Sequence, residues 1–270
     1  MIMRRIIALL AAVAFAAVLS YRLAAQQTAQ LAGRGGGSRF SQPEPIDFDD
    51  HTGWTSMFDG MTLKGWDGSN EVWRAEGGAI VGESTPEKPA GTTYVIWEGG
   101  EPKNFELKAE VKLEGTGANS GIQYRSSRVT QPQGGPVPNP RFAKWNLKGY
   151  QADFDFANRF SGQLYEQGTT RGIIAWRGQV VRTEQGKKPR LLSVLGDPEA
   201  LKGFIKVNDW NQMHVIARGN TMIHMLNGHA MSIFIDDDPS MAVAQGVIGL
   251  QIEGGGHVKV SFRNLWLKNL

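Results

Sequence analysis

Apolar and polar residues alternate with a period of two through most of the chain from about residue 51 onward. The alternation is clearest in residues 105–113, where every odd position is apolar and every even position is charged. Successive side chains of a strand point to opposite faces, so this segment predicts a strand with one face on a hydrophobic core. No stretch of a dozen residues sustains the apolar stripe of a helix. The pattern therefore predicts a domain made almost entirely of β-strands.

Turn signals separate the predicted strands. Asn227-Gly228 lies between two of them and is a strong hairpin signal, because both residues tolerate positive φ. One short helix is predicted at 197–203, with Asp197 as its N-cap and Pro198 in its first turn. The further strands are predicted at 78–83, 93–97, 122–125, 150–156, 172–176, 179–182, 211–218, 222–226, 229–235, 246–253 and 257–267.

Many short strands, glycine-rich turns and little helix favour an all-β fold. We expect two antiparallel sheets stacked as a jelly-roll or concanavalin-like sandwich, with at most one or two short helices. A β-propeller is the main alternative, but the sequence has no fixed-period repeat to support it.

The N-terminal segment has the composition of a targeting sequence. Arg4 and Arg5 precede an apolar run at 6–19, and small residues follow up to Ala25. This layout predicts a signal peptide at 1–25 and an exported protein, periplasmic or secreted. A retained membrane anchor is a weaker interpretation, because the apolar run is shorter than the roughly 20 residues that span a bilayer.

Residues 26–50 are rich in Gln, Gly, Ser and Pro, which predicts a flexible linker before a single domain at 51–270. The chain contains no cysteine, so packing must supply its stability in an oxidising compartment.

Charge narrows the range of partners. Three of the 29 basic residues, Arg4, Arg5 and Arg22, lie in the predicted signal, which leaves 26 basic residues against 26 acidic ones. A balanced charge without a basic run argues against a nucleic acid, and against a membrane once the signal is cleaved. A neutral partner such as a carbohydrate fits better. The sequence carries no signal for an oligomeric state.

Ten blocks of this sequence resemble the 3-keto-disaccharide hydrolase domain family of exported bacterial proteins. They follow one another in order at 58–66, 73–82, 104–107, 119–125, 149–153, 162–166, 210–211, 226–228, 249–251 and 262–265. The resemblance implies a concanavalin-like sandwich that cleaves a glycosidic bond in sugars already oxidised at C3.

The chemistry that the resemblance implies follows from the C3 ketone. The ketone acidifies the C2 hydrogen, so a general base can remove it and the C1 substituent can leave by elimination before water adds back. Direct hydrolysis is the alternative and needs two carboxylates about 5 to 10 Å apart. A non-catalytic glycan-binding module, or a structural domain of an envelope assembly, also remains open.

Candidate site residues come from the polar positions of the predicted strands and from the family blocks. Glu253 stands where the family commonly carries a histidine. The candidate catalytic residues are Asp153, Glu166 and Glu253. The candidate substrate-binding residues are Gln123, Arg125, Gln151, Tyr165, Gln251 and His224.

Each candidate also has an ordinary structural interpretation. Arg125, expected on the polar face of its strand, either binds sugar hydroxyls or an enolate, or forms an ion pair with Asp153 or Asp155. His224 has apolar neighbours, which favours a hydrogen-bonded structural role. No cofactor and no metal is predicted, because the five histidines lack the spacing of metal ligands.

Aromatic residues offer a second kind of sugar contact, because the C–H faces of pyranose rings pack on aromatic rings. Most of the tryptophans are expected in the core. Trp145 and Trp176 adjoin polar, glycine-containing loops and are predicted to be exposed. The long loop at 129–140 is expected to border one end of a sugar-binding groove.

Overall fold

The computed structural model describes residues 43–134 and 139–270. The predicted signal peptide, residues 26–42 of the predicted linker and residues 135–138 of the predicted loop lie outside the described residues. The chain divides into two units, 1–46 and 47–270, and the fold described below is that of the second. Within the described ranges, no helix has the length and hydrophobicity needed to cross a membrane.

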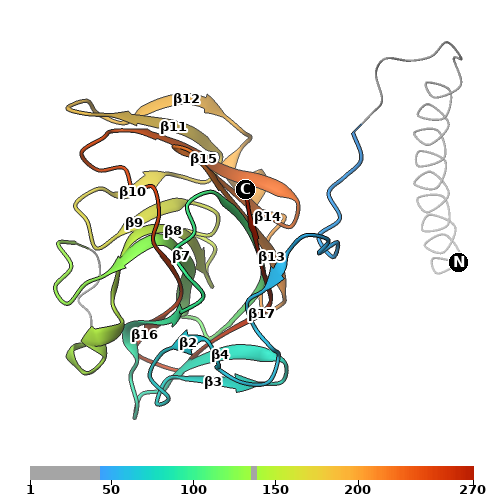
Figure 1. Cartoon of the computed structure of the whole chain (residues 1–270), viewed down its shortest axis with the longest axis vertical. Coiled ribbons are helices and arrows are strands. Elements are labelled where there is room, and N and C mark those ends of the chain that lie inside the picture. The colour runs from blue at the N-terminus through green and yellow to red at the C-terminus, as the bar shows by residue number, and fades with distance from the viewer. Residues whose placement is uncertain (1–42, 135–138) are drawn as a thin grey trace, which may run out of the picture. The chain divides into compact units, whose positions relative to one another are not determined.

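The larger sheet contains ten strands. They are β1 (Thr55–Ser56), β3 (Trp73–Glu76), β4 (Ala79–Ser84), β6 (Phe105–Glu114), β11 (Gln179–Glu184), β12 (Arg190–Val194), β13 (Asn211–Arg218), β14 (Thr221–Leu226), β15 (His229–Asp237) and β17 (Val258–Asn269). Their order is β12-β11-β15-β14-β13-β6-β17-β4-β3, and β1 pairs with β17. Consequently β3 and β12 form opposite edges, which lie at opposite ends of the molecule (Figure 1).

The smaller sheet contains seven strands. They are β2 (Trp66–Asp67), β5 (Gly91–Trp97), β7 (Asn119–Arg128), β8 (Leu147–Asp155), β9 (Leu164–Gln167), β10 (Gly172–Ala175) and β16 (Val247–Gly254). Their order is β10-β9-β8-β7-β16-β5-β2. Two short helices complete the described fold, the 3-10 helix η1 (Pro140–Trp145) and the helix α2 (Pro198–Lys202).

This architecture confirms the predicted all-β sandwich of the jelly-roll, concanavalin-like type. The predicted short helix is also confirmed, and Asp197 caps α2 by accepting hydrogen bonds from the backbone of Glu199 and Ala200. One detail differs from a purely antiparallel pattern, because β11 pairs with β15 in parallel. The sequence pattern missed β1, β2, β3, β9 and β12. These strands are short, and β12 is an edge strand with every residue exposed, so it has no burial alternation to detect.

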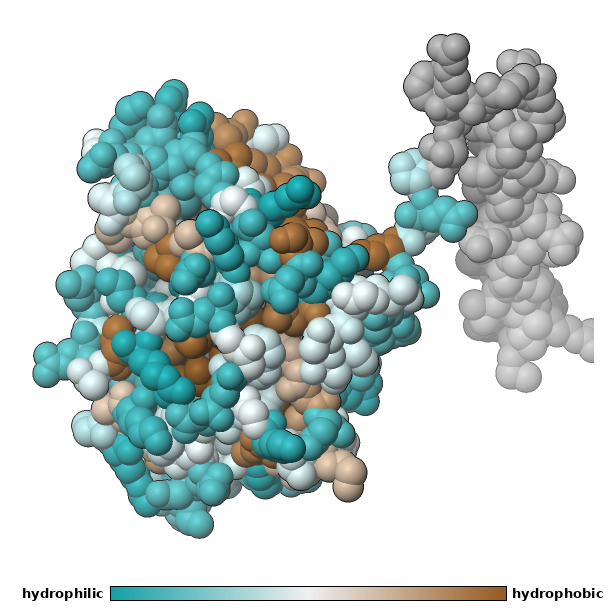
Figure 2. Space-filling view, in the orientation of Figure 1, coloured by the Kyte–Doolittle hydropathy of each residue, from teal (hydrophilic) through white to brown (hydrophobic). Residues whose placement is uncertain are grey.

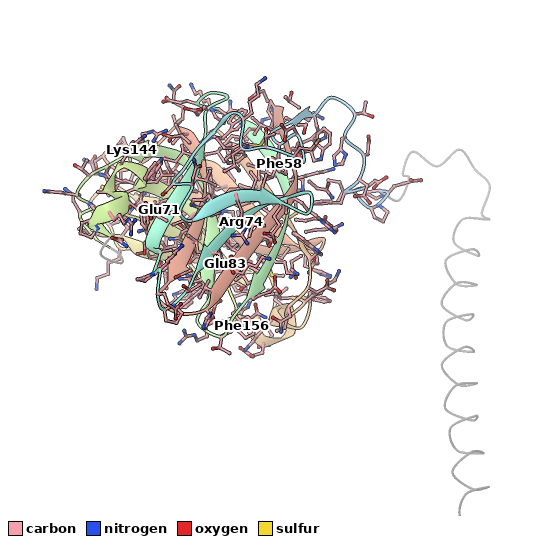
Figure 3. The ribbon with its side chains drawn as sticks, turned by 90° about the horizontal axis from the view of Figure 1, so that it is seen from below. Phe58, Glu71, Arg74, Glu83, Lys144 and Phe156 are labelled. Atoms are coloured by element: carbon pink, nitrogen blue, oxygen red, sulfur yellow. The ribbon has the colours of Figure 1, made fainter. Side chains whose placement is uncertain are left out.

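The core lies between the sheets and is built from the alternating apolar residues. The predicted inward face of β6 is confirmed, since Phe105, Leu107 and Val111 are fully buried. Outside the core, the molecule presents a mostly hydrophilic surface with small separate hydrophobic patches on the face shown in Figure 2. On that exterior, Arg74 of β3 lies beside Glu83 of β4 in an exposed ion pair (Figure 3).

The outer face of the larger sheet is covered near β6 by the segment 47–54. Lys108 points to this outer face, yet it is only 1% exposed. Its Nζ donates to the carbonyls of Asp47, Phe48 and Asp50 at 2.9 to 3.0 Å and lies 4.7 Å from the Trp54 ring centroid. This part of the outer face of the larger sheet is therefore covered.

A buried ion cluster ties the two sheets together. Arg171 donates to both carboxylate oxygens of Glu166 on β9, at 2.5 and 2.7 Å. The same guanidinium donates to both oxygens of Asp236 on β15, at 3.1 and 2.8 Å. Tyr150 on β8 also donates to Asp236, at 2.6 Å. Because β9 belongs to one sheet and β15 to the other, this cluster fixes the distance between the layers.

We expect Arg171→Met to destabilise the fold strongly, because two buried carboxylates would lose their cation. Breaking a buried pair in this way costs about 3 to 5 kcal/mol of the free energy of unfolding. The matched control is Arg182→Met, which removes a half-exposed ion pair with Asp237 and should cost less than about 1 kcal/mol. Urea unfolding measures both, and equal losses would contradict the role of the cluster.

Candidate functional site

The outer face of the smaller sheet is polar at its centre. In β8, Ala152 points into the core, while Gln151 and Asp153 point outward. In β16, Leu250 and Ile252 are core residues and their neighbours point to the same outer face as Gln151 and Asp153. Strands β8, β7 and β16 are adjacent, so the period-two alternation brings these outward residues together.

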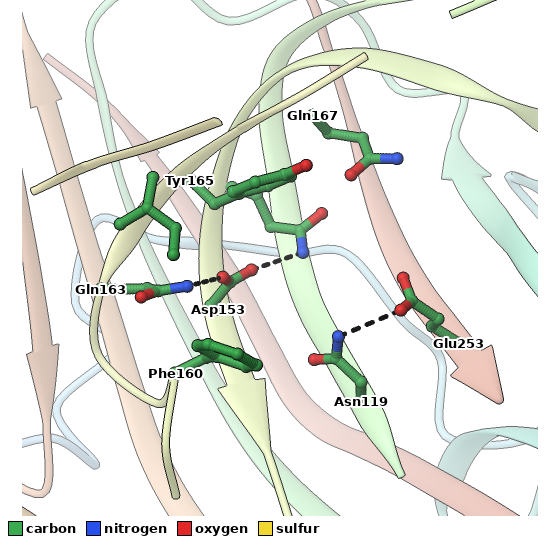
Figure 4. Close-up of a pocket in the computed structure, with 9 residues that line it drawn as sticks. Asn119, Asp153, Phe160, Gln163, Tyr165, Gln167 and Glu253 are labelled. Carbon is green, nitrogen blue, oxygen red and sulfur yellow. Dashed lines mark hydrogen bonds between the residues drawn. The ribbon is translucent and has the colours of Figure 1, made fainter. Parts of the chain in front are cut away.

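A pocket of about 160 Å³ opens on this face (Figure 4). Strands β7, β8, β9, β10 and β16 and the turn after β8 supply its walls. Asp153 and Gln163 lie on one side of it with Phe160, and Glu253 and Asn119 lie on the other (Figure 4). The nine lining residues are Asn119, Gln151, Asp153, Phe160, Gln163, Tyr165, Gln167, Ile173 and Glu253.

Asp153 is a buried carboxyl group whose hydrogen-bond donors are amides. Gln151 Nε2 donates to Oδ1 at 2.6 Å, and Gln163 Nε2 donates to Oδ2 at 2.5 Å. Burial disfavours the charged form and raises the pKa of Asp153 to about 7, although the two amide hydrogen bonds act in the opposite direction. The negative charge of Glu253 adds to the rise. Asp153 therefore exchanges its proton near neutral pH.

Glu253 is the second carboxyl group of the pocket. Asn119 Nδ2 donates to its Oε1 and Thr92 Oγ1 to its Oε2, each at 3.3 Å. Burial raises the pKa of Glu253 above its ordinary value, and these two hydrogen bonds limit the rise. None of the nine described residues that line the pocket is Lys, Arg or His.

A chain of amide hydrogen bonds joins the two carboxyl groups. Gln151 Nε2 donates to Asp153 and also to Gln251 Oε1, at 2.9 Å. Gln251 Nε2 in turn donates to Tyr94 OH at 3.0 Å and to Glu253 Oε2 at 3.4 Å. The two carboxyl groups thus belong to one polar network on the sheet surface.

The network needs close packing of backbone and side chain at Gly121. A Cβ atom at this position would lie 2.7 Å from both Ala152 O and Gln151 Cγ. Glycine therefore gives Gln151 the room to reach Asp153. Two acceptors of the network, Gln151 Oε1 and Gln163 Oε1, are buried and receive no hydrogen bond from the described residues.

The structure brings four of the predicted site residues to the pocket and places two beside it. Asp153, Glu253, Gln151 and Tyr165 line the pocket. Gln251 forms part of the network beneath it. Gln123 of β7 lies on the same sheet face as Gln151. It is fully buried, and its amide group lies 3.0 Å from Ser126 Oγ, so it supports the sheet instead of lining the pocket.

Arg125 does not lie on the polar face where the alternation places it. The register of β7 shifts between Tyr124 and Ser127, and Arg125 has a φ of 46°. This bulge turns the guanidinium toward the edge of the core, where it donates to Lys103 O at 2.6 Å and Gly219 O at 2.8 Å. The structure records no ion pair between Arg125 and Asp153 or Asp155 among the described residues, so both sequence interpretations are replaced by a backbone-capping role.

Glu166 and His224 lie between the sheets, away from the pocket. Glu166 points inward from β9 to Arg171, because the outward positions of that strand are Tyr165 and Gln167. His224 contacts Tyr124 OH through Nε2 at 2.7 Å and Gln163 O through Nδ1 at 3.2 Å. Burial lowers the pKa of His224 to about 4, which keeps the ring neutral. The structural interpretation of this histidine is the one that the geometry supports.

Five pocket residues were not among the candidates. Asn119 and Gln163 lie inside the family blocks, which was the signal available for them. Gln167 follows the block that ends at Glu166, and its period-two spacing from Tyr165 was the signal that it shares a face with that residue. Phe160 and Ile173 carry no polar group to attract notice. Across residues 43–134 and 139–270, no group of three or more His, Asp and Glu is arranged to hold a metal ion.

The sequence model of a protein family, the 3-keto-alpha-glucoside-1,2-lyase-like domain, matches residues 53–268. The chain belongs to this family, which confirms the resemblance identified from the sequence blocks. No curated protein sequence matches the chain.

Several solved structures resemble the domain. Two come from Parabacteroides distasonis ATCC 8503, and each is described as a candidate glycosyl hydrolase. The first has a TM-score of 0.48 and 20% identity and covers 81% of this chain and 94% of its own. The second has a TM-score of 0.49 and 16% identity, and the match covers 80% of this chain and 99% of the other. The carbohydrate-binding module CBM66 from Bacillus subtilis has a TM-score of 0.47 and 15% identity, with 77% and 97% covered.

The raised pKa of Asp153 predicts a specific dependence of stability on pH. A carboxyl with a pKa of about 7 in the folded chain binds its proton more tightly than the same group in the unfolded chain, where the pKa is about 3.9. Its contribution to the free energy of unfolding is therefore complete below about pH 4 and is lost as the pH rises through about 7.

We expect the difference in unfolding free energy between wild type and Asp153→Asn to fall from about pH 5 to about pH 8, by at most about 1.4 kcal/mol per pH unit. Urea unfolding at several pH values measures this difference, with Glu114→Gln on the other sheet as the control. A difference that stays constant with pH would rule out a buried, near-neutral acid at this position.

Proposed function

We propose that the pocket cleaves the glycosidic bond of a 3-keto-α-glucoside by elimination across C1 and C2. The observation that carries this proposal is the pair of carboxyl groups, Asp153 and Glu253, which face one small pocket and both have raised pKa values. Strongly perturbed carboxyl groups that share a cavity are typical of acid–base catalysis. The family to which the chain belongs supports the choice of substrate.

The reaction needs two proton transfers and one stabilised anion. A base removes the C2 proton, and the electron pair moves onto the C3 oxygen to form an enolate. The enolate then re-forms the ketone, the C1–O bond breaks with its electrons on the leaving oxygen, and an acid protonates that oxygen. The products are an enone with a C1–C2 double bond and a free alcohol. Water can then add to the enone to give the 3-keto sugar.

The two carboxyl groups take different roles because their surroundings differ. Asp153 holds its proton up to about neutral pH and is the proposed acid for the leaving oxygen. Glu253 is the proposed base for the C2 proton. The amide of Asn119 and the hydroxyl of Tyr165 are the proposed donors for the enolate oxygen, since both groups line the same pocket.

The direct test is turnover of 3-keto-trehalose by the purified protein. We expect Asp153→Asn and Glu253→Gln each to lower kcat by about 100- to 10,000-fold, as loss of a general acid or base does. Glu114→Gln, which removes an exposed carboxylate on the other sheet, should leave kcat unchanged.

A substrate with a good leaving group separates the two roles. 4-Nitrophenolate needs little protonation to leave, so Asp153→Asn should recover most of its lost activity on 4-nitrophenyl 3-keto-α-glucoside. Glu253→Gln should remain inactive on both substrates, because C2 deprotonation is still required. Wild-type protein that binds these sugars and releases no product would instead identify a glycan-binding module.

The charge of the pocket predicts which sugars it rejects. Its two acidic residues and the absence of Lys, Arg and His among its described lining residues disfavour a carboxylate on the sugar. We expect a 3-keto-glucuronide to have a kcat/KM at least about 10-fold below that of the matching 3-keto-glucoside. The gap should widen above pH 7, where Asp153 is charged, and equal values for the two sugars would contradict the model.

A further inference from the structure

The apolar wall of the pocket continues to an exposed tryptophan. Phe160 lines the pocket on the side of Asp153 (Figure 4), and Ile173 of β10 also lines it. Trp176 directly follows β10, and its ring centroid lies 6.5 Å from that of Phe160, with the two planes inclined at 42°. Trp176 is 46% exposed. Phe160 therefore connects the lining of the pocket to an exposed aromatic ring.

A buried arginine holds this aromatic pair in place. Arg177, next to Trp176, is 6% exposed and donates through Nη1 to Asn158 O at 3.1 Å and to Ser161 O at 2.8 Å. These two carbonyls flank Phe160 in the turn after β8. Gln179 fixes the other side, because its Oε1 accepts from Trp176 N at 3.1 Å. The backbone that carries the two rings is thus anchored on both sides.

The pocket itself is large enough for only one sugar ring. A cavity of about 150 Å³ holds a molecule of the size of benzene, and the pocket here measures about 160 Å³. When one pyranose ring occupies it, the second ring of a disaccharide must lie outside. On the opposite side, Glu253 and Asn119 present polar groups (Figure 4), whereas the Phe160 side offers the apolar surface that the C–H face of a pyranose ring packs on.

We propose that Trp176, together with Phe160, forms a second sugar subsite that binds the leaving-group pyranose ring of a disaccharide. Trp176 stacks on the apolar face of that ring, and Arg177 is the positioning residue that keeps Trp176 and Phe160 in register. This proposal rests on the proposed function of the pocket and adds the residues that select the leaving group, with Trp176 as a specificity-determining residue for a second sugar ring.

The test compares a two-ring substrate with a one-ring substrate. 3-Keto-trehalose carries the second ring, and methyl 3-keto-α-glucoside has only a methyl group in its place. We expect Trp176→Ala to lower kcat/KM for 3-keto-trehalose about 10-fold, as the loss of one aromatic contact does. The value for the methyl glucoside should not change. Trp176→Phe should retain most of the activity on 3-keto-trehalose, because an aromatic face remains.

The matched control is Trp210→Ala. Trp210 lies just before β13 of the larger sheet, 4.1 Å from the guanidinium carbon of Arg263, and should affect neither substrate. Equal losses on both substrates after Trp176→Ala would reveal a structural role and overturn the subsite. No loss on 3-keto-trehalose would overturn it as well.

Equilibrium binding separates the subsite from the reaction. Titration calorimetry compares trehalose with methyl α-glucoside, in wild type and in Trp176→Ala. If wild type turns over neither 3-keto sugar, a loss of affinity confined to trehalose supports the subsite while the proposed reaction fails. If wild type turns over neither 3-keto sugar and also binds neither trehalose nor methyl α-glucoside, both the subsite and the reaction are overturned.

Discussion

The site depends on the solvation of one buried carboxyl group, Asp153, and one partly buried carboxyl group, Glu253, by neutral donors. Asp153 has two glutamine amides as partners, and Glu253 has amides and a hydroxyl. A buried charge costs free energy unless a partner compensates it. A carboxyl group without such a partner takes up a proton instead. The sheet provides this surrounding because the outward positions of β8 and β16, which lie on either side of β7, bring Gln151 and Gln251 within hydrogen-bonding distance.

The inner layer supports this outer face. Strand β9 carries Tyr165 and Gln167 outward to the pocket and Glu166 inward to Arg171. The cation is thereby kept on the inner side of the sheet, beneath the pocket residues whose backbone it helps to fix. Alternation along one short strand separates a stabilising ion cluster from a titratable site, although the two are neighbours in the sequence.

Period-two alternation predicted the sandwich and the shared face of Gln151 and Asp153, because long strands with a buried face leave a clear pattern. The same pattern failed for Arg125, since one extra residue in β7 reverses the direction of the side chain and leaves no mark in composition. It also gave no direction for Glu166, whose strand has only four residues. Phe160 escaped notice because a turn, and not a strand, carries it to the pocket.

Two buried aspartates show how the partner decides the chemistry. Burial raises the pKa of Asp236, but the hydrogen bonds and charge of Arg171 and the hydroxyls of Tyr150 and Thr183 outweigh it, and the net pKa is lowered. Asp153 is also buried, yet only amides oppose the effect, and its pKa rises to about 7. An amide can turn its carbonyl to accept from the protonated acid or its NH₂ group to donate to the carboxylate. It therefore accommodates both protonation states, which a guanidinium does not, and the proposed acid role of Asp153 requires both states.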